Sequence, residues 1–184
     1  MLVHRSKEKL RNAIIYFVQN TKYCGKTKLF KLLYFLDFEH FSQTGRSVTG
    51  LEYFAWPKGP VPVEIFDEVE SPGPILEGVV EVTKRTAYNG NVINDIAPLQ
   101  GFSGEHFSKR EMKLLVGLSK EYANSYADDM VEATHLENLP WHQIYEVEGQ
   151  KQHLIPYELA LKKSEYDQAL KNIIDDKEFK ENYS

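Results

Sequence analysis

The stretch 29–41 constrains the fold most, because it is apolar on almost every side of a helix. Nine large apolar residues fall within it: Leu29, Phe30, Leu32, Leu33, Tyr34, Phe35, Leu36, Phe38 and Phe41. A helix that is hydrophobic all round is buried in a protein core. We therefore expect a central helix that Thr27 caps and that ends near Gln43, with Gly45 as its left-handed stop residue.

Further helices are predicted around this central one. Apolar residues recur every three or four positions over 6–19, which indicates an amphipathic helix. Capping boxes, in which a Ser and an acidic residue three positions later bond each other's backbone, predict three more helix starts: Ser108 with Glu111, Ser125 with Asp128, and Ser164 with Asp167. Pro140 suits the first turn of a short helix. The charged tail over about 175–184 is expected to fray.

Strand signals occur in two places. The run 51–56 is aromatic and apolar and precedes the proline and glycine cluster 57–62, which predicts a strand followed by a rigid turn. Pro62 is expected in the first turn of a short helix that continues to about residue 69. Apolar runs on both sides of Asn89 and Gly90 predict a β-hairpin. The chain 1–184 is expected to be a single, mainly α-helical (α+β) domain with a small β-sheet or hairpin.

The composition argues against several classes of protein. Lys and Arg total 22 and Asp and Glu total 27, a formal charge of −5, whereas a protein that coats nucleic acid needs a surplus of cations on its binding face. Cys24 is the only cysteine, so neither an intramolecular disulfide nor a cysteine zinc site is expected. No apolar run approaches the ~18 residues that span a bilayer, and the charged start lacks a signal-peptide core. We expect a cytoplasmic protein without membrane contact.

Gly25, Lys26 and Thr27 match the end of a phosphate-binding loop. The match is incomplete, because Asn20 stands where the loop needs its first glycine and the preceding segment has helical spacing. A connecting turn into the central helix is the favoured interpretation.

Two carboxylate and histidine pairs at i, i+3 spacing are the strongest indication of an enzyme. Asp37 with His40, and Glu132 with His135, would each lie on one helical face, as in half of a di-iron carboxylate site. The other predicted helices offer only ordinary surface acids as further ligands. Cys24 lacks a recognisable base and no Ser lies in a G-x-S-x-G elbow. We therefore expect no catalysis and no cofactor, and keep a metal-dependent helical enzyme as an alternative.

Lys26, Lys28 and Lys31 beside Tyr34 allow two interpretations. They could form a basic and aromatic surface for nucleic acid, or the solvated edge of a helix whose aromatic residues fill the core. The second is favoured, so a nucleic-acid-binding regulator remains only an alternative.

The aromatic residues at 53, 54 and 56 run directly into the stiff turn 57–62. Large side chains on a backbone of low conformational entropy make good binding anchors. Trp56 could equally fill the hydrophobic core while the turn reverses the direction of the chain. Both roles stay open.

Two separate motifs resemble a known family. The first comprises Lys31, Leu32, Leu33, Tyr34 and Phe35, then Thr44, Gly45 and Arg46, then Ala55, Trp56, Gly59, Pro60 and Val61. The second comprises Thr134, His135, Pro140 and Trp141. In this order, and over about 10–145, the chain resembles the Panacea domain, the SocA-like antitoxin family of bacteria and phages. Pro57 departs from the family's usual residue before the Gly-Pro-Val turn.

The resemblance implies a mostly helical antitoxin that neutralises a cognate protein toxin by direct contact. In the SocA-like branch it also implies an adaptor that hands the toxin to a AAA+ protease. A homo-oligomer is left open. We hypothesise that the turn and the second motif define or support the toxin-contacting face. The residues assigned to this face are Tyr34, Trp56, Lys58, Gly59, Pro60, Val61, His135, Pro140 and Trp141.

Overall fold

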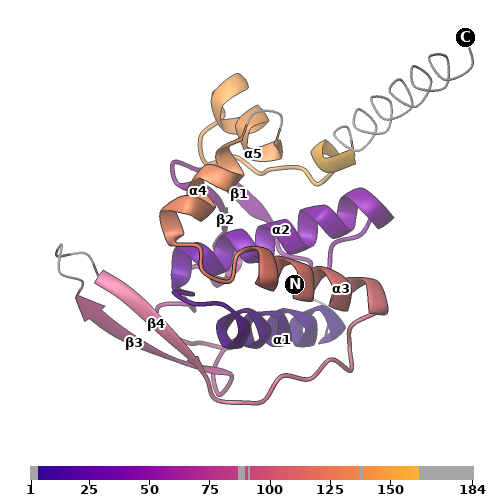
Figure 1. Cartoon of the computed structure of the whole chain (residues 1–184). Helices are drawn as coiled ribbons and strands as arrows, with labels where there is room; N and C mark the ends of the chain where they lie inside the picture. Colours follow the sequence, from indigo (N-terminus) through magenta and orange to yellow (C-terminus); the bar gives the residue numbers. More distant parts are fainter. Residues whose placement is uncertain (1–3, 87–89, 91, 137–138, 162–184) are drawn as a thin grey trace, which may run out of the picture.

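The computed structural model describes residues 4–86, 90, 92–136 and 139–161, and within them the chain is mainly helical with two small antiparallel sheets (Figure 1). The helices are α1 (His4–Asn20), α2 (Lys26–Thr44), α3 (Lys109–Glu121), α4 (Ala127–His135) and α5 (Pro140–His142). Two short turns add to them, the 3₁₀-helix η1 (Val63–Ile65) and the π-helix η2 (Gln143–Val147). The strands are β1 (Tyr53–Trp56), β2 (Gly59–Pro62), β3 (Val80–Thr86) and β4 (Val92–Pro98). The predicted mainly α, α+β class is confirmed.

Helix α2 lies at the centre, as its composition predicts. Every residue from 28 to 38 is buried, and α2 packs against α1, α3, α4, β2 and β4. In Figure 1, α1 lies on one side of α2 and α4 with the β1–β2 hairpin on the other. The helix ends as predicted at Gly45, whose φ is +70° and whose N–H donates to the carbonyl of Phe41 at 2.7 Å. The prediction that Thr27 caps α2 is wrong, because Gly25 occupies the N-cap and Thr27 lies inside the first turn.

The proline and glycine cluster is a strand of its own. β1 pairs with β2 in antiparallel register, from Tyr53 opposite Pro62 to Trp56 opposite Gly59. The prolines fit because β2 forms the outer edge, while the other side of β1 bonds to 152–155. The predicted rigid turn is therefore the second half of a hairpin. The helix predicted from Pro62 to about residue 69 is only the 3₁₀ turn η1 followed by irregular turns, and Pro62 is the last residue of β2.

The second hairpin is confirmed. β3 and β4 pair from Val80 opposite Pro98 to Thr86 opposite Val92. Gly90 has a φ of +82°, while Asn89 lies outside the described residues. β4 contacts α1 and α2, and the β3–β4 hairpin lies beside the helical body (Figure 1).

The capping predictions have mixed outcomes. Ser108 and Glu111 form the predicted box, with backbone N–H to side-chain oxygen distances of 3.3 and 2.6 Å. The second box is wrong by one residue, since Asp129 accepts from the Tyr126 N–H at 2.6 Å and α4 starts at Ala127. Pro140 occupies the first turn of α5 as predicted. The third box, Ser164 with Asp167, and the tail over 175–184 lie outside the described residues.

Among the described residues, no helix has the length and apolar character needed to cross a membrane.

Candidate functional site

The structure brings the two sequence motifs together. The indole Nε1–H of Trp141 donates to the backbone carbonyl of Trp56 at 3.0 Å. The ammonium of Lys31 donates to the carbonyl of Pro60 at 2.8 Å. We call this meeting of α2, the β1–β2 hairpin and the α4–α5 corner the hairpin joint.

Gly59 is required at the hairpin joint for two reasons. Its φ of +95° is a conformation that side-chain-bearing residues rarely adopt. A Cβ atom there would also lie 2.7 Å from Oγ1 of Thr134 and 2.8 Å from Cε of Lys31. The hairpin therefore approaches α2 and α4 as closely as a glycine backbone allows.

Aromatic stacking completes the hairpin joint. The ring of His135 stacks on Trp141 with centroids 3.7 Å apart, and Trp141 stacks on Tyr145 at 4.7 Å. Trp141 is only 1% exposed. The hydroxyl of Tyr34 and Nε2 of His135 are buried and make no hydrogen bond of normal geometry within the described residues.

The nine residues assigned to the toxin-contacting face differ in exposure. The buried ones are Tyr34, Gly59, Pro60, Val61, Pro140 and Trp141. Trp56 and His135 are half-buried, and Trp56 packs against Phe66 with ring centroids 5.1 Å apart. Lys58, at the hairpin tip, is the exposed one. Most of the set can therefore shape a surface but cannot itself be touched by a partner.

The prediction that the lysines of α2 form a solvated helix edge is wrong for two of them. Lys31 is 1% exposed, and burial lowers its pKa to about 7. Lys28 is also fully buried, and burial lowers its pKa as well. Because α2 is covered on all sides, the ammonium groups of both residues find backbone carbonyls in place of water.

Lys28 links three segments of the chain. Its ammonium donates to the carbonyls of Lys22, Tyr122 and Ser125 at 2.7, 2.7 and 2.8 Å. The carbonyls of Lys22 and Tyr122 lie just after α1 and at the end of α3, where helices leave acceptors unpaired, and the carbonyl of Ser125 lies in the turn before α4. One buried cation thus fixes the ends of three helices relative to α2.

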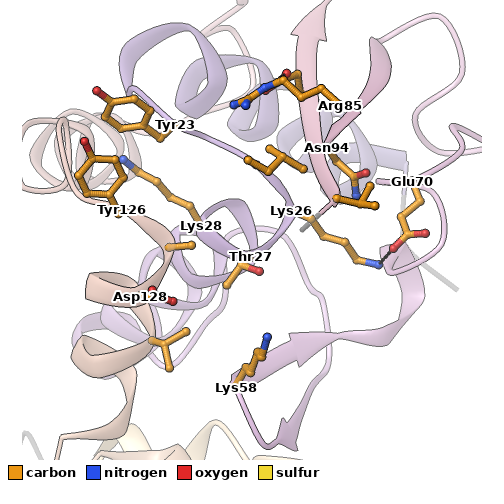
Figure 2. Close-up of a pocket in the computed structure, with 16 residues that line it drawn as sticks. Tyr23, Lys26, Thr27, Lys28, Lys58, Glu70, Arg85, Asn94, Tyr126 and Asp128 are labelled. Carbon is orange, nitrogen blue, oxygen red and sulfur yellow. Dashed lines mark hydrogen bonds and ion pairs between the residues drawn. The ribbon is translucent and has the colours of Figure 1, made fainter. Parts of the chain in front are cut away.

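An open groove of about 700 Å³ lies next to the hairpin joint (Figure 2). Its walls come from the segment before α2, the β1–β2 tip, the β3–β4 hairpin and the start of α4. Lys58 connects the groove to the hairpin joint, and its amine lies on the groove side in Figure 2. Gly25, Lys26 and Thr27 also line it, but α1 precedes them where a phosphate-binding loop needs a strand.

Aromatic rings are exposed at one end of the groove. Tyr23 and Tyr126 are 55% and 58% exposed, and their rings stack with centroids 4.5 Å apart and an interplanar angle of 21°. Val92, which also lines the groove, is 65% exposed. Sequence reasoning missed the tyrosines, because each stands alone beside a helix end and no local pattern pairs them.

Most cations of the groove have partners. Lys26 forms an ion pair with Glu70 at 2.6 Å, and Arg85 pairs with Asp95. Lys28 is engaged by carbonyls, as above. Among the described residues, Lys58 is the one lining cation without an ion pair or hydrogen bond.

The first predicted metal pair is engaged inside the protein. Oδ1 of Asp37 accepts from the N–H groups of Val48 and Thr49 at 2.8 and 2.7 Å, and Oδ2 accepts from the hydroxyls of Thr49 and Tyr53 at 2.5 and 2.7 Å. Burial raises the pKa of Asp37, and these hydrogen bonds act in the opposite direction. Nδ1 of His40 lies 2.6 Å from the carbonyl oxygen of Arg46.

No three His, Cys, Asp or Glu side chains within the described residues gather closely enough to hold a metal ion. Glu132 is exposed on α4, whereas His135 stacks in the hairpin joint. Burial raises the pKa of the Cys24 thiol to about 11, so this cysteine is a poor nucleophile at neutral pH.

Comparison with known proteins identifies the family. No curated protein and no solved structure matches the chain. The model of the family described as Antitoxin SocA-like, Panacea domain, matches residues 29–142. This match covers more than half of the sequence and includes both motifs of the hairpin joint. The chain thus belongs to the SocA-like antitoxin family that the Panacea domain defines.

Proposed function

We propose that this protein is an antitoxin that neutralises a cognate protein toxin by binding it directly. The observation that carries the proposal is the family match over 29–142, which spans most of α2, both hairpins, α3 and α4. The chemistry of the site fits binding better than catalysis. Both carboxylate oxygens of Asp37 accept hydrogen bonds from internal donors, and the Cys24 thiol is protonated at neutral pH.

The hairpin joint supports this function as a scaffold. Its two hydrogen bonds and the close approach at Gly59 fix the β1–β2 hairpin against α2 and α4. A recognition surface that is rigid before binding loses less conformational entropy when the partner docks. The formal charge of −5 also favours association with a basic partner through complementary charge.

Co-expression tests the proposal. The neighbouring open reading frame is induced alone and together with this chain, and growth is followed. We expect arrest in the first case and rescue in the second. Rescue should be lost when the antitoxin gene carries an early stop codon, which separates the protein from its transcript. Continued arrest in the presence of the folded chain would contradict the proposal.

Toxin removal by a AAA+ protease is a second route that the family resemblance implies. We propose that direct binding is sufficient. Rescue should therefore persist in a host that lacks the protease, with an unchanged toxin half-life. Rescue that disappears in this host, together with a longer toxin half-life, would assign the chain an adaptor role instead.

A further inference from the structure

We propose that the stacked side chains of Tyr23 and Tyr126 form a preorganised docking shelf that receives an apolar or aromatic side chain of the toxin, with an acidic toxin residue beside Lys58. We call the two rings the tyrosine shelf. The inference rests on the proposed antitoxin function and assigns its contact surface. That surface lies in the groove and not on the buried tryptophan of the hairpin joint.

The exposure of the tyrosine shelf is the first observation. Tyr23 and Tyr126 present more than half of their surfaces to solvent within a concave groove that also exposes Val92. Tyrosine is enriched among residues that dominate binding energy, since it combines a large apolar ring with a hydroxyl and loses little side-chain entropy. A concave site allows such rings to be desolvated on binding.

The backbone of Tyr23 is the second observation. Its φ of +57° lies in the left-handed region, which is uncommon for residues other than glycine. Such a conformation persists only where the surroundings impose it, and such residues gather at binding and active sites. A structural turn at this position would be better served by glycine. The tyrosine side chain adds nothing to the buried core, because it is 55% exposed and its ring packs on the equally exposed Tyr126.

The buried Lys28 is the third observation, because it imposes this geometry. Its ammonium bonds the carbonyl of Lys22, directly before Tyr23, and the carbonyl of Ser125, directly before Tyr126. The N–H of Lys22 also donates to the carbonyl of Ala123 at 2.8 Å. The two turns that carry the rings are therefore fixed to each other before any partner arrives, which reduces the entropy lost on binding.

Charge identifies the partner chemistry. Lys26 and Arg85 are paired with acidic residues, whereas Lys58 has no ion pair or hydrogen bond among the described residues and reaches the same groove. Asp128, on the α4 side, lies in the first turn of that helix, where the helix dipole stabilises a negative charge. Lys58 is therefore the lining cation, among the described residues, that is left for a partner to pair with. An acidic side chain of the toxin beside Lys58 would complement it locally, even where the toxin as a whole is basic.

Calorimetric titration with the purified protein encoded by the neighbouring open reading frame tests the tyrosine shelf. The double variant Y23A/Y126A should bind at least about tenfold more weakly than the wild type. Tyr126→Phe should bind more tightly than the double variant, because it keeps the aromatic ring. Tyr23→Gly should bind more weakly, yet unfold at an equal or higher temperature, because glycine relieves the left-handed strain. A merely structural role for Tyr23 would lower stability and binding together.

Matched controls keep the outcomes distinct. Val147→Ala also truncates an exposed apolar residue, but outside the groove, and should bind like the wild type. Lys58→Glu should weaken binding at least about tenfold, while Lys113→Glu on α3 should not. If the wild type binds and Y23A/Y126A loses less than tenfold, the shelf is overturned and the antitoxin function stands. A wild-type chain that neither binds nor rescues would overturn the function itself.

Discussion

The indole N–H of Trp141 donates a hydrogen bond at 3.0 Å to the backbone carbonyl of Trp56, which lies 85 positions earlier in the chain. This contact joins the two motifs on which the family resemblance rests, and its donor, the Trp141 side chain, is buried. Trp141 therefore anchors the β1–β2 hairpin to the α4–α5 corner. Its role is to hold the surface in place, whereas the exposed residues of the groove are free to touch a partner.

Truncating Trp141 should destabilise the fold. Trp141→Ala removes a fully buried aromatic side chain with its stacking on His135, and we expect a loss of about 3–5 kcal/mol in the free energy of unfolding. Trp141→Phe keeps a ring but leaves the Trp56 carbonyl without its donor, at a cost of about 1–3 kcal/mol. Urea denaturation measures both. An unchanged midpoint for Trp141→Ala would contradict the buried anchor.

Gly59→Ala should be destabilising, because it adds left-handed strain to a clash with Thr134 and Lys31. We expect the free energy of unfolding to fall by about 1–3 kcal/mol. Gly117→Ala is the matched control, because it lies inside α3 with no atom within 4 Å of the added Cβ. The free energy of unfolding of this control should rise by about 0.5–1 kcal/mol, because alanine has a higher helix propensity than glycine. Thermal unfolding of both variants checks the opposite signs, and the same sign for both would contradict the close approach at Gly59.

Lys31 predicts a pH dependence of stability. Burial lowers the pKa of Lys31 in the folded protein to about 7, below its usual value of 10.5, so the unfolded chain binds the proton more tightly. The stability that this group contributes is full at high pH and is lost as the pH falls towards 7. Between about pH 7 and 8.5, below the titration of cysteine and tyrosine, wild-type stability should rise with pH.

Lys31→Met provides the comparison for this prediction. The variant keeps a long side chain without the ionisable amine, so the rise in its unfolding free energy with pH should be shallower than in the wild type. The measurement is a urea denaturation series at several pH values. Parallel curves for the two proteins would show that Lys31 keeps an ordinary pKa and is not buried as described.

Asp37 should act as a structural hub and not as a metal ligand. Asp37→Ala would leave the N–H groups of Val48 and Thr49 and the hydroxyl of Tyr53 without their acceptor. We expect the free energy of unfolding to fall by about 3 kcal/mol or more, since several buried donors lose their acceptor at once. Elemental analysis of the wild type should find no stoichiometric iron, manganese or zinc. One equivalent of bound metal in the wild type that is absent from Asp37→Ala would instead support the metalloenzyme alternative.

Local signals in the sequence were sufficient for the elements that depend on neighbouring residues. The apolar surface of α2, the left-handed Gly45 and the capping box of Ser108 with Glu111 are all short-range patterns, and the structure contains each of them. The position of Pro140 in a first helical turn is of the same kind. These features follow from propensity and spacing alone.

Features that depend on distant parts of the chain could not be predicted in this way. The burial of Lys28 and Lys31 requires carbonyls from other segments, which no helical pattern reveals. The strand β2 contains two prolines and is possible only because it lies at a sheet edge. The tyrosine shelf pairs residues that are 103 positions apart, so only the folded chain brings them together.

Direct titration of the purified chain with the purified product of the neighbouring toxin gene tests the central claim most directly. The account predicts saturable binding by the wild type, and rescue of growth in cells by the same protein. A toxin that is neutralised in cells but shows no binding to the folded chain would contradict neutralisation by direct contact.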